Sequence, residues 1–269
     1  MTFARSILFN ILFYLWTAVL CVGLLWTLVL PRRAMMAGAL FYLRGIAVME
    51  RVVVGLDYRV IGRDRLPEGP CIVAAKHQSA WETLKLHLIL DDPAPVLKRE
   101  LLSVPVWGWY AAKADLIPVD RGGRSKAIQS MITAARRIAA QGRPIVIFPQ
   151  GTRTSPGAWR PYRVGVVALY ENLHLPVVPM ALNSGLFWGR RKFLKSPGTV
   201  TVEFLDPIPP GLDRDSFIKR LESELETASE RISLAAGGPA TARPDPAEHA
   251  AMRREARDVP EADGESADA

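Results

Sequence analysis

The feature that most constrains this chain is a run of 25 residues without a charge near its amino terminus, from Ser6 to Leu30. As an α-helix the run would be about 37 Å long, against about 30 Å for the hydrocarbon core of a bilayer. It is too long for the apolar region of a signal peptide, and Pro31-Arg32-Arg33 follows it instead of a small-residue cleavage pattern. A core helix of a soluble protein seldom stays apolar on every face. The run therefore predicts a membrane-embedded segment.

The charges that flank this run predict its orientation. Arg5 precedes it, whereas arginines 32, 33, 44 and 51 follow it. If the run spans the bilayer as a transmembrane helix, the positive-inside bias places the rest of the chain on the cytoplasmic face of the cell (inner) membrane. A second apolar stretch, Ala34 to Leu43, is too short to span but can pair with the first as a helical hairpin in one leaflet. The sequence leaves spanning and lying on the membrane open.

Composition limits what the remaining residues can do. Of 269 residues, 49% are hydrophobic, which is enough for a sizeable core. Two cysteines exclude a disulfide scaffold and a four-cysteine zinc site, and no histidine pair has a ligand spacing, so we expect no metal. Residues 235–269 carry four arginines against eight acidic residues and predict a disordered acidic tail. The rest carries +11 and predicts an anionic partner: nucleic acid, anionic lipid or a phosphorylated substrate.

Between these ends, segments with strand and helix patterns alternate, which is typical of an α/β layer domain. We expect a membrane-anchoring helical segment over 1–50, an α/β domain over 51–234 and the tail over 235–269. The predicted strands are Val52–Ile61, Cys71–Ala75, Ile145–Phe148, Val177–Leu182 and Thr199–Leu205. The predicted helices are Ala80–Leu90, Arg124–Gln141, Tyr162–Leu173 and Asp213–Leu234.

One histidine, His77, lies between a predicted buried strand and a helix, and strand ends are where ligands bind in α/β folds. If His77 lies in the loop and Glu82 in the first helical turn, the carboxylate can fix one imidazole nitrogen and leave the other free as a general base. The alternative is structural. Ser79-x-x-Glu82 matches a capping box, in which the two side chains satisfy each other's backbone N–H groups. Spacing alone leaves both readings open.

Two further segments can bind a phosphate. Gly151, Thr152 and Arg153 follow a predicted strand, so backbone N–H groups, a hydroxyl and a guanidinium can converge there. The alternative is an ordinary strand-end turn with a surface arginine. Arg121, before two glycines, is a second candidate phosphate ligand, although an Asp-Arg pair is usually a surface ion pair.

The order of these segments resembles the glycerolipid acyltransferase family, which includes the 1-acylglycerol-3-phosphate acyltransferases of phospholipid synthesis. The resemblance runs from about Gly55 to Pro207, and Lys98–Gly108 also looks like a family segment. It rests on four ordered blocks: His77-x4-Glu82, Val119-Asp120-Arg121, Phe148-Pro149-Gln150-Gly151-Thr152-Arg153 and Leu175-Pro176-Val177-Val178-Pro179.

The resemblance implies a fold and an activity. The fold is α/β, with a mixed sheet flanked by helices. The activity is transfer of a fatty acyl group from acyl-CoA or acyl carrier protein to the free hydroxyl of 1-acylglycerol-3-phosphate (lysophosphatidic acid), which gives phosphatidic acid without a cofactor. It makes His77 the general base, Glu82 its orienting carboxylate, and Arg121, Gly151, Thr152 and Arg153 the ligands of the acceptor phosphate. Pro179 matches the defining residue of the fourth block, which packs near the acyl site.

Three positions depart from the family pattern: Glu82 stands where Asp is usual, Gln150 replaces a Glu, and Asp115 replaces a Gly. The last two leave open another acceptor, such as lyso-ornithine lipid, which has no phosphate, or loss of activity. A membrane lipid-binding protein without catalysis is a second alternative. No nucleic-acid-binding motif accompanies the basic charge, so we expect membrane lipid rather than nucleic acid as the partner.

Overall fold

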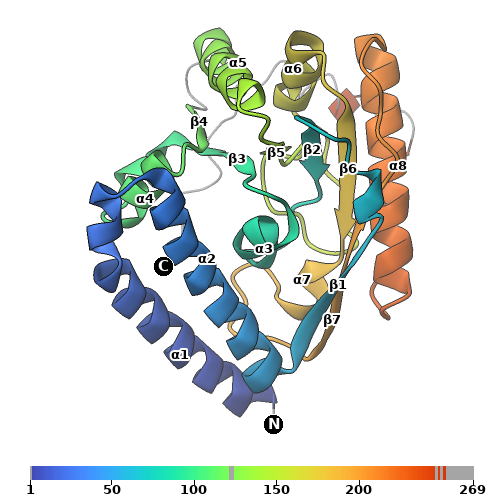
Figure 1. Ribbon diagram of the computed structural model, residues 1–269. Coiled ribbons are helices and arrows are strands. Elements are labelled where there is room, and N and C mark those ends of the chain that lie inside the picture. The colour runs from blue at the N-terminus through green and yellow to red at the C-terminus, as the bar shows by residue number, and fades with distance from the viewer. Residues whose placement is uncertain (1, 121–123, 246–247, 249–250, 253–269) are drawn as a thin grey trace.

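The computed structural model describes residues 2–120, 124–245, 248, 251 and 252. It contains a seven-stranded mixed sheet with helices on both faces, and an antiparallel pair of long helices lies beside it (Figure 1). The α/β prediction is therefore confirmed. The strands are β1 (Leu56–Ile61), β2 (Ile72–Ala75), β3 (Ala94–Lys98), β4 (Ile117–Val119), β5 (Ile145–Ile147), β6 (Val177–Leu182) and β7 (Gly198–Phe204).

Helices connect and cover these strands. The α-helices are α1 (Thr2–Gly23), α2 (Arg32–Met49), α3 (Trp81–Ile89), α4 (Trp107–Lys113), α5 (Arg124–Ala140), α6 (Val164–Leu173), α7 (Ser184–Phe187) and α8 (Arg214–Leu234). Shorter helical turns are η1 (Leu25–Val29), η2 (Glu50–Val54), η3 (Arg63–Arg65) and η4 (Arg99–Ser103).

The strand order is β1-β7-β6-β2-β5-β3-β4, and every neighbouring pair is parallel except β6 with β7. Strand β2 lies at the centre, between β6 and β5. Because β2 and β5 run in the same direction, the loops that follow them leave the sheet at the same edge. This edge is where ligands bind in open α/β sheets.

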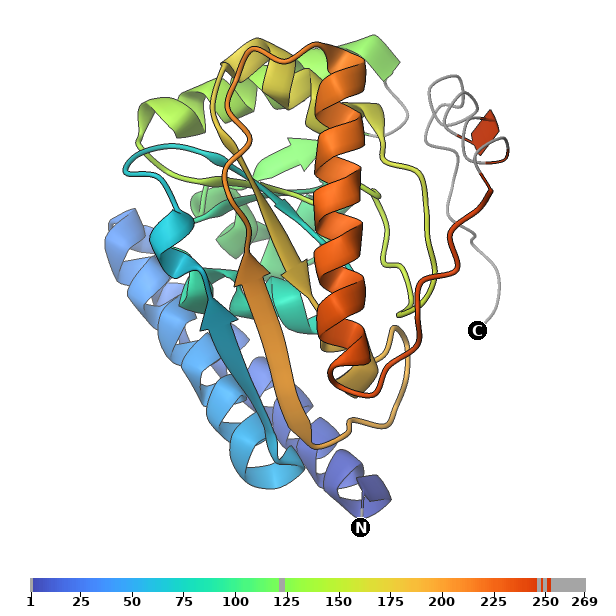
Figure 2. The same ribbon diagram turned by 90° about the vertical axis from the view of Figure 1, so that its right-hand side faces the viewer.

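Alternation along β2 divides the core into two layers. Ile72 and Ala74 face the cluster formed with α5, α6 and α8, whereas Val73 and Ala75 face the cluster that contains α3 and Phe9 of α1. Figure 2 shows α8 along one face of the sheet, with the α1–α2 pair on the other side. Both sides of β2 are buried, which explains its continuously apolar sequence.

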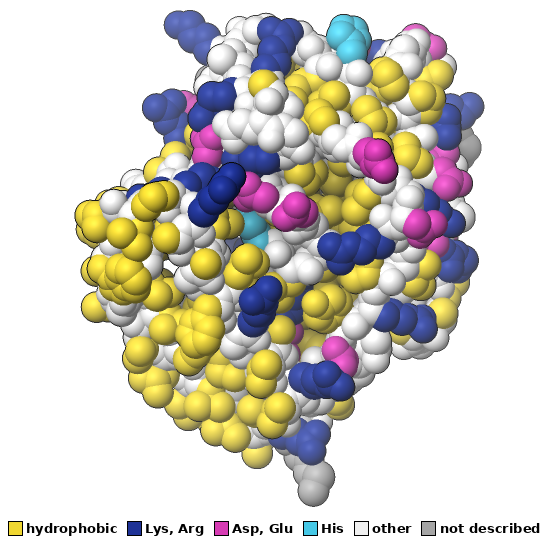
Figure 3. All heavy atoms as spheres, viewed as in Figure 1, with side chains coloured by type: hydrophobic (Ala, Val, Ile, Leu, Met, Phe, Trp, Pro, Cys, Tyr) yellow, Lys and Arg dark blue, Asp and Glu magenta, His cyan; other side chains and the backbone are white. Residues whose placement is uncertain are grey.

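The amino-terminal residues form a helical hairpin instead of one long helix. Helix α1 ends at Gly23, the turn η1 follows, and Pro31 directly precedes the start of α2 at Arg32. Apolar side chains cover the outer surface of this hairpin (Figure 3), and exposed ones on α1 include Ile11, Tyr14 and Leu15. Among the described residues, α1 is the one helix long and apolar enough to cross a membrane by length and composition.

The predicted strand Val52–Ile61 is wrong in its first half. Helix α2 continues through the π-helical turn η2, and the strand begins only at Leu56. Gly55 ends the helix in the left-handed conformation, with φ +79°, which glycine adopts without steric cost. The valines favour a strand locally. However, Val54 is buried in the same cluster as Phe9 of α1, and this tertiary packing outweighs the local preference.

Other elements escaped the sequence analysis because they are short. Strands β3 and β4, with five and three residues, and helices α4 and α7 carry too few residues to show a period. Part of the predicted tail is described: the Thr241 N–H donates to Glu230, and Arg243 pairs with the same carboxylate. Residues 253–269 lie outside the described part of the chain. The division into three parts stays a prediction.

Candidate active site

The candidate catalytic residues lie in the loops that follow β2 and β5, the two neighbouring parallel strands. His77 comes two residues after β2, and the segment 148–153 follows β5. The His77 ring stacks on Phe148 with ring centroids 4.0 Å apart, and the Thr154 N–H donates to the His77 carbonyl oxygen at 2.8 Å. The sheet thus brings together two blocks that are about 70 residues apart in the sequence.

Glu82 orients the His77 ring. Nδ1 of His77 lies 2.8 Å from Oε1 of Glu82, whose side chain is 1% exposed against 14% for the histidine. A carboxylate only accepts hydrogen bonds, so Nδ1 carries the proton and Nε2 is left with its lone pair. This is the arrangement that a general base requires.

Glu82 also serves the helix terminus, so its carboxylate makes contacts of both predicted kinds. Its Oε1 accepts the backbone N–H groups of Gln78 and Ser79, each at 2.7 Å, and its Oε2 accepts the Ser184 hydroxyl at 2.6 Å. Ser79 Oγ accepts from the Trp81 N–H instead of the Glu82 N–H, so the capping box is only half formed. Four donors therefore fix the carboxylate in place.

A cavity of about 1710 Å³ opens beside His77. Its polar part is lined by Gly151, Thr152 and Arg153, and its apolar part by side chains of both hairpin helices, including Leu20 and Met36. Figure 3 shows a hollow between the apolar hairpin surface and the α/β body, with basic side chains at its border. The cavity is large enough for a ligand with an anionic group and a long apolar tail.

The third block has the backbone that a phosphate site needs. Gly151 has φ +67°, a conformation that residues with a Cβ rarely adopt. Arg153 lines the cavity and forms no ion pair with a described residue, so its guanidinium is available to an anion. Arg121 lies outside the described residues.

Sequence reasoning missed four further arginines that line this cavity. They come from two loops that no motif marks: Arg160 and Arg163 before α6, and Arg190 and Arg191 after α7. Their only sequence signal was the positive charge of the body.

Gln150 is buried and turned toward α8. Its Nε2 donates to Oε1 of Glu226 at 3.4 Å, the Tyr162 hydroxyl donates to the same oxygen at 2.8 Å, and the Lys76 ammonium binds both carboxylate oxygens at 2.7 and 2.6 Å. Burial lowers the pKa of Lys76, which the nearby Glu226 partly offsets. Helix α8 thus supplies a carboxylate beside the position where the resembled family has its glutamate.

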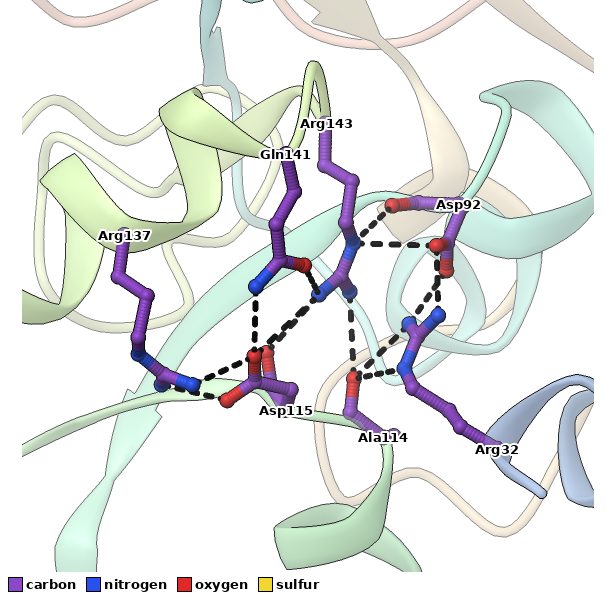
Figure 4. Close-up of polar contacts among 7 residues, drawn as sticks. All are labelled: Arg32, Asp92, Ala114, Asp115, Arg137, Gln141 and Arg143. Atoms are coloured by element: carbon purple, nitrogen blue, oxygen red, sulfur yellow. Dashed lines mark hydrogen bonds and ion pairs between the residues drawn. The ribbon is translucent and has the colours of Figure 1, made fainter.

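Asp115, the third departure, turns away from the cavity. It has φ +58°, which accounts for glycine as the usual residue there. Its carboxylate pairs with Arg137 at 2.7 Å and lies 3.8 Å from Arg143, as Figure 4 shows. Arg143 also pairs with Asp92, which binds Arg32 at the start of α2 through two hydrogen bonds. This cluster fastens the tip of the hairpin to the α/β body.

His87, a second histidine in the cavity wall, has a different environment. Burial lowers its pKa to about 4, so it is neutral at physiological pH. Its Nε2 is buried without a partner among the described residues. Unlike His77, it has no carboxylate of a described residue hydrogen-bonded to its ring, and the geometry gives it no role as a base.

Comparisons with known proteins agree with this geometry. The family model described as Acyltransferase matches residues 57–183. A 1-acyl-sn-glycerol-3-phosphate acyltransferase of Pseudomonas aeruginosa is 36% identical over 182 residues, which are 68% of this chain and 69% of that protein. One of Saccharomyces cerevisiae is 27% identical over 214 residues, 76% of this chain and 71% of that protein.

The fold itself resembles a solved structure. The crystal structure of the 1-acyl-sn-glycerophosphate (LPA) acyltransferase PlsC from Thermotoga maritima matches with a TM-score of 0.70. The match covers 86% of this chain and 98% of that one at 20% sequence identity, and at that identity the likeness concerns the fold.

Proposed function

Because the chain belongs to the acyltransferase family, we propose that it transfers a fatty acyl group from acyl-CoA or acyl carrier protein to the free hydroxyl of 1-acylglycerol-3-phosphate, forming phosphatidic acid. The observation that carries the proposal is the His77–Glu82 contact of 2.8 Å beside a cavity that also holds Arg153. His77 and Arg153 line the same cavity as apolar side chains of the hairpin. The polar residues suit the headgroup of a lysophosphatidic acid, and the apolar walls suit acyl chains.

The proposed reaction needs no protein nucleophile. Nε2 of His77 takes the hydroxyl proton while the oxygen attacks the thioester carbonyl carbon. A C–O bond forms, and the C–S bond breaks as the tetrahedral intermediate collapses. The imidazolium then returns the proton to the leaving thiolate. Glu82 holds the ring in the required tautomer and stabilises the positive charge that His77 carries in between.

Arg153 and Gly151 are proposed to bind the acceptor phosphate, and Thr152 to donate its hydroxyl. Guanidinium binds phosphate through two parallel N–H groups, which also fixes its orientation. The additional arginines of the cavity wall, Arg160 and Arg163, increase its attraction for anions. Arg121 keeps the same proposed role.

The hairpin is proposed to lie in one leaflet instead of spanning the bilayer. Helix α1 contacts the α/β body in both of its halves. Phe9 packs edge-on against Trp188 with ring centroids 5.4 Å apart, and the Tyr110 hydroxyl donates to the Cys21 carbonyl at 3.1 Å. A spanning helix would leave the body at one end only. The exposed apolar face then sits in the cytoplasmic leaflet of the inner membrane, where the lysolipid acceptor is dissolved.

A panel of acceptors tests the proposal. Purified full-length protein is given a labelled acyl donor with lysophosphatidic acid, lysophosphatidylcholine or lyso-ornithine lipid, and thiol release and labelled product are both measured. We expect phosphatidic acid as the main product. A preference for lyso-ornithine lipid that survives Arg153→Ala would favour the phosphate-free acceptor. Absence of acceptor-dependent thiol release from any pair would favour a lipid-binding protein.

A further inference from the structure

The loop between α7 and β7 combines positive charge with exposed apolar side chains. Three consecutive cations, Arg190, Arg191 and Lys192, are exposed. The next two residues, Phe193 and Leu194, are 49% and 47% exposed. Large apolar side chains beside lysine and arginine are typical of surfaces that bind anionic membranes.

Helix α1 holds this loop in place. The rings of Phe3 and Phe193 have centroids 5.8 Å apart, and the Asn10 side-chain amide donates to the Phe193 carbonyl at 3.3 Å. Ser6 Oγ accepts the Lys195 N–H at 3.0 Å. Figures 1 and 2 both place the loop beside the first turns of α1.

These contacts explain the polar residues of the apolar run. Ser6 and Asn10 are the two polar residues between Arg5 and Phe13, and both bind the loop, with the Lys195 ammonium also donating to Asn10 Oδ1 at 2.9 Å. The loop and α1 therefore form one structural unit. If α1 lies in the membrane surface, the loop lies at the same depth.

The loop also reaches the candidate active site. Arg190 and Arg191 line the cavity that holds His77 and Arg153. Cations on this loop thus line the same cavity as His77, while Phe193, whose ring lies beside Phe3, continues the exposed apolar surface of α1.

We propose that residues 190–194 form a second membrane contact, in which Phe193 and Leu194 enter the headgroup region and the three cations bind anionic lipids. The contact sets the mouth of the cavity at the bilayer surface. It rests on the proposed function for its purpose, because the acceptor is a membrane lipid, but the binding itself needs no acyl transfer.

A fluorescent label tests the insertion. Leu194→Cys is prepared in a Cys21→Ala background of the full chain and labelled with an environment-sensitive dye. We expect a blue shift and higher emission with vesicles that contain phosphatidylglycerol. The control label is Thr133→Cys on α5, which is exposed at the opposite end of the molecule and should not respond. An unchanged Leu194 label on protein that co-sediments with the vesicles would overturn the proposal.

Charge variants test the lipid specificity. Each cation near an anionic surface strengthens binding by about fivefold, so Arg191→Gln/Lys192→Gln should weaken binding to phosphatidylglycerol vesicles by about 25-fold. The matched control removes the same charge elsewhere, as Arg136→Gln/Lys219→Gln on α5 and α8. Equal losses for both variants would contradict a local contact.

The two proposals fail in different ways. If the acyl-transfer proposal is wrong, the Leu194 label still responds to vesicles while no acceptor is acylated. If the loop proposal is wrong, acylation proceeds while the label and the charge variants behave like their controls.

Discussion

Moving one negative charge between Gln150 and Glu226 tests how α8 supports the candidate site. Lys76, next to His77, is 3% exposed and has Glu226 as its carboxylate partner among the described residues. Glu226→Gln leaves this buried ammonium without its ion-pair partner. Breaking a buried ion pair from one side costs about 3–5 kcal/mol. With about 2–4 °C for each kcal/mol in a domain of this size, we expect the melting temperature to fall by about 6–20 °C.

The reverse substitution creates the opposite conflict. Gln150→Glu places a second carboxylate where Nε2 now lies 3.4 Å from Glu226 Oε1, so two like charges would share one ammonium. We expect this variant to be destabilised as well, more at neutral than at acidic pH, because one of the two carboxyls must take up a proton to relieve the repulsion.

The double variant Gln150→Glu/Glu226→Gln restores one negative charge beside Lys76. The two side chains are in contact, so their effects should not add, and we expect the double variant to regain at least half of the loss caused by Glu226→Gln. Thermal unfolding of the wild type and the three variants gives the coupling, and turnover measured in parallel shows whether the site recovers with the fold. If the melting temperature of the double variant falls by the sum of the two single losses, the two side chains do not share the Lys76 charge.

Substitutions at three further positions have defined outcomes. Glu82→Gln should lower turnover by about 10²–10³ with little change in melting temperature. The three N–H groups that now donate to Oε1 would hold the amide oxygen in the same place, so only the charge is lost. Glu82→Asp, which keeps the charge, should retain most activity. Arg153→Lys should raise the KM for the acceptor but not for the acyl donor, because an ammonium lacks the planar fork; equal effects on both substrates would exclude a phosphate contact. Asp115→Gly should destabilise the protein by about 1 kcal/mol, since relief of the positive φ offsets part of the lost ion pairs, and kinetic constants should not change because Asp115 does not line the cavity.

The sequence predicted the parts of the fold that repeat over many residues. Helices α5 and α8 carry long amphipathic patterns, and β2 is a continuous apolar run, so the sequence pattern predicted where these elements lie. Strands β3 and β4 were not, because the few residues of each are defined by their neighbours in the sheet. The turn η2 was misread because valines favour strands locally, whereas its packing against α1 depends on tertiary structure.

The candidate site was predictable where motif and chemistry coincide. His77 and Glu82 stand at a spacing that the loop after β2 turns into a contact. Ser184, Tyr162 and Glu226 were not predictable, because each reaches the site from a distant segment and carries no local signal. Long-range contacts of this kind accommodate Glu82 and Gln150 at their unusual positions.

The measurement that tests the account most directly is the formation of phosphatidic acid from lysophosphatidic acid by the wild type and by His77→Ala. Both proteins are purified at full length, and their melting temperatures are measured first. Turnover is compared only if the two melting temperatures agree, so that folding is not the cause of any difference. We expect the wild type to form phosphatidic acid and the variant to be slower by about 10²–10⁴. Near-normal turnover in a folded His77→Ala protein would contradict the assignment of His77 as the general base.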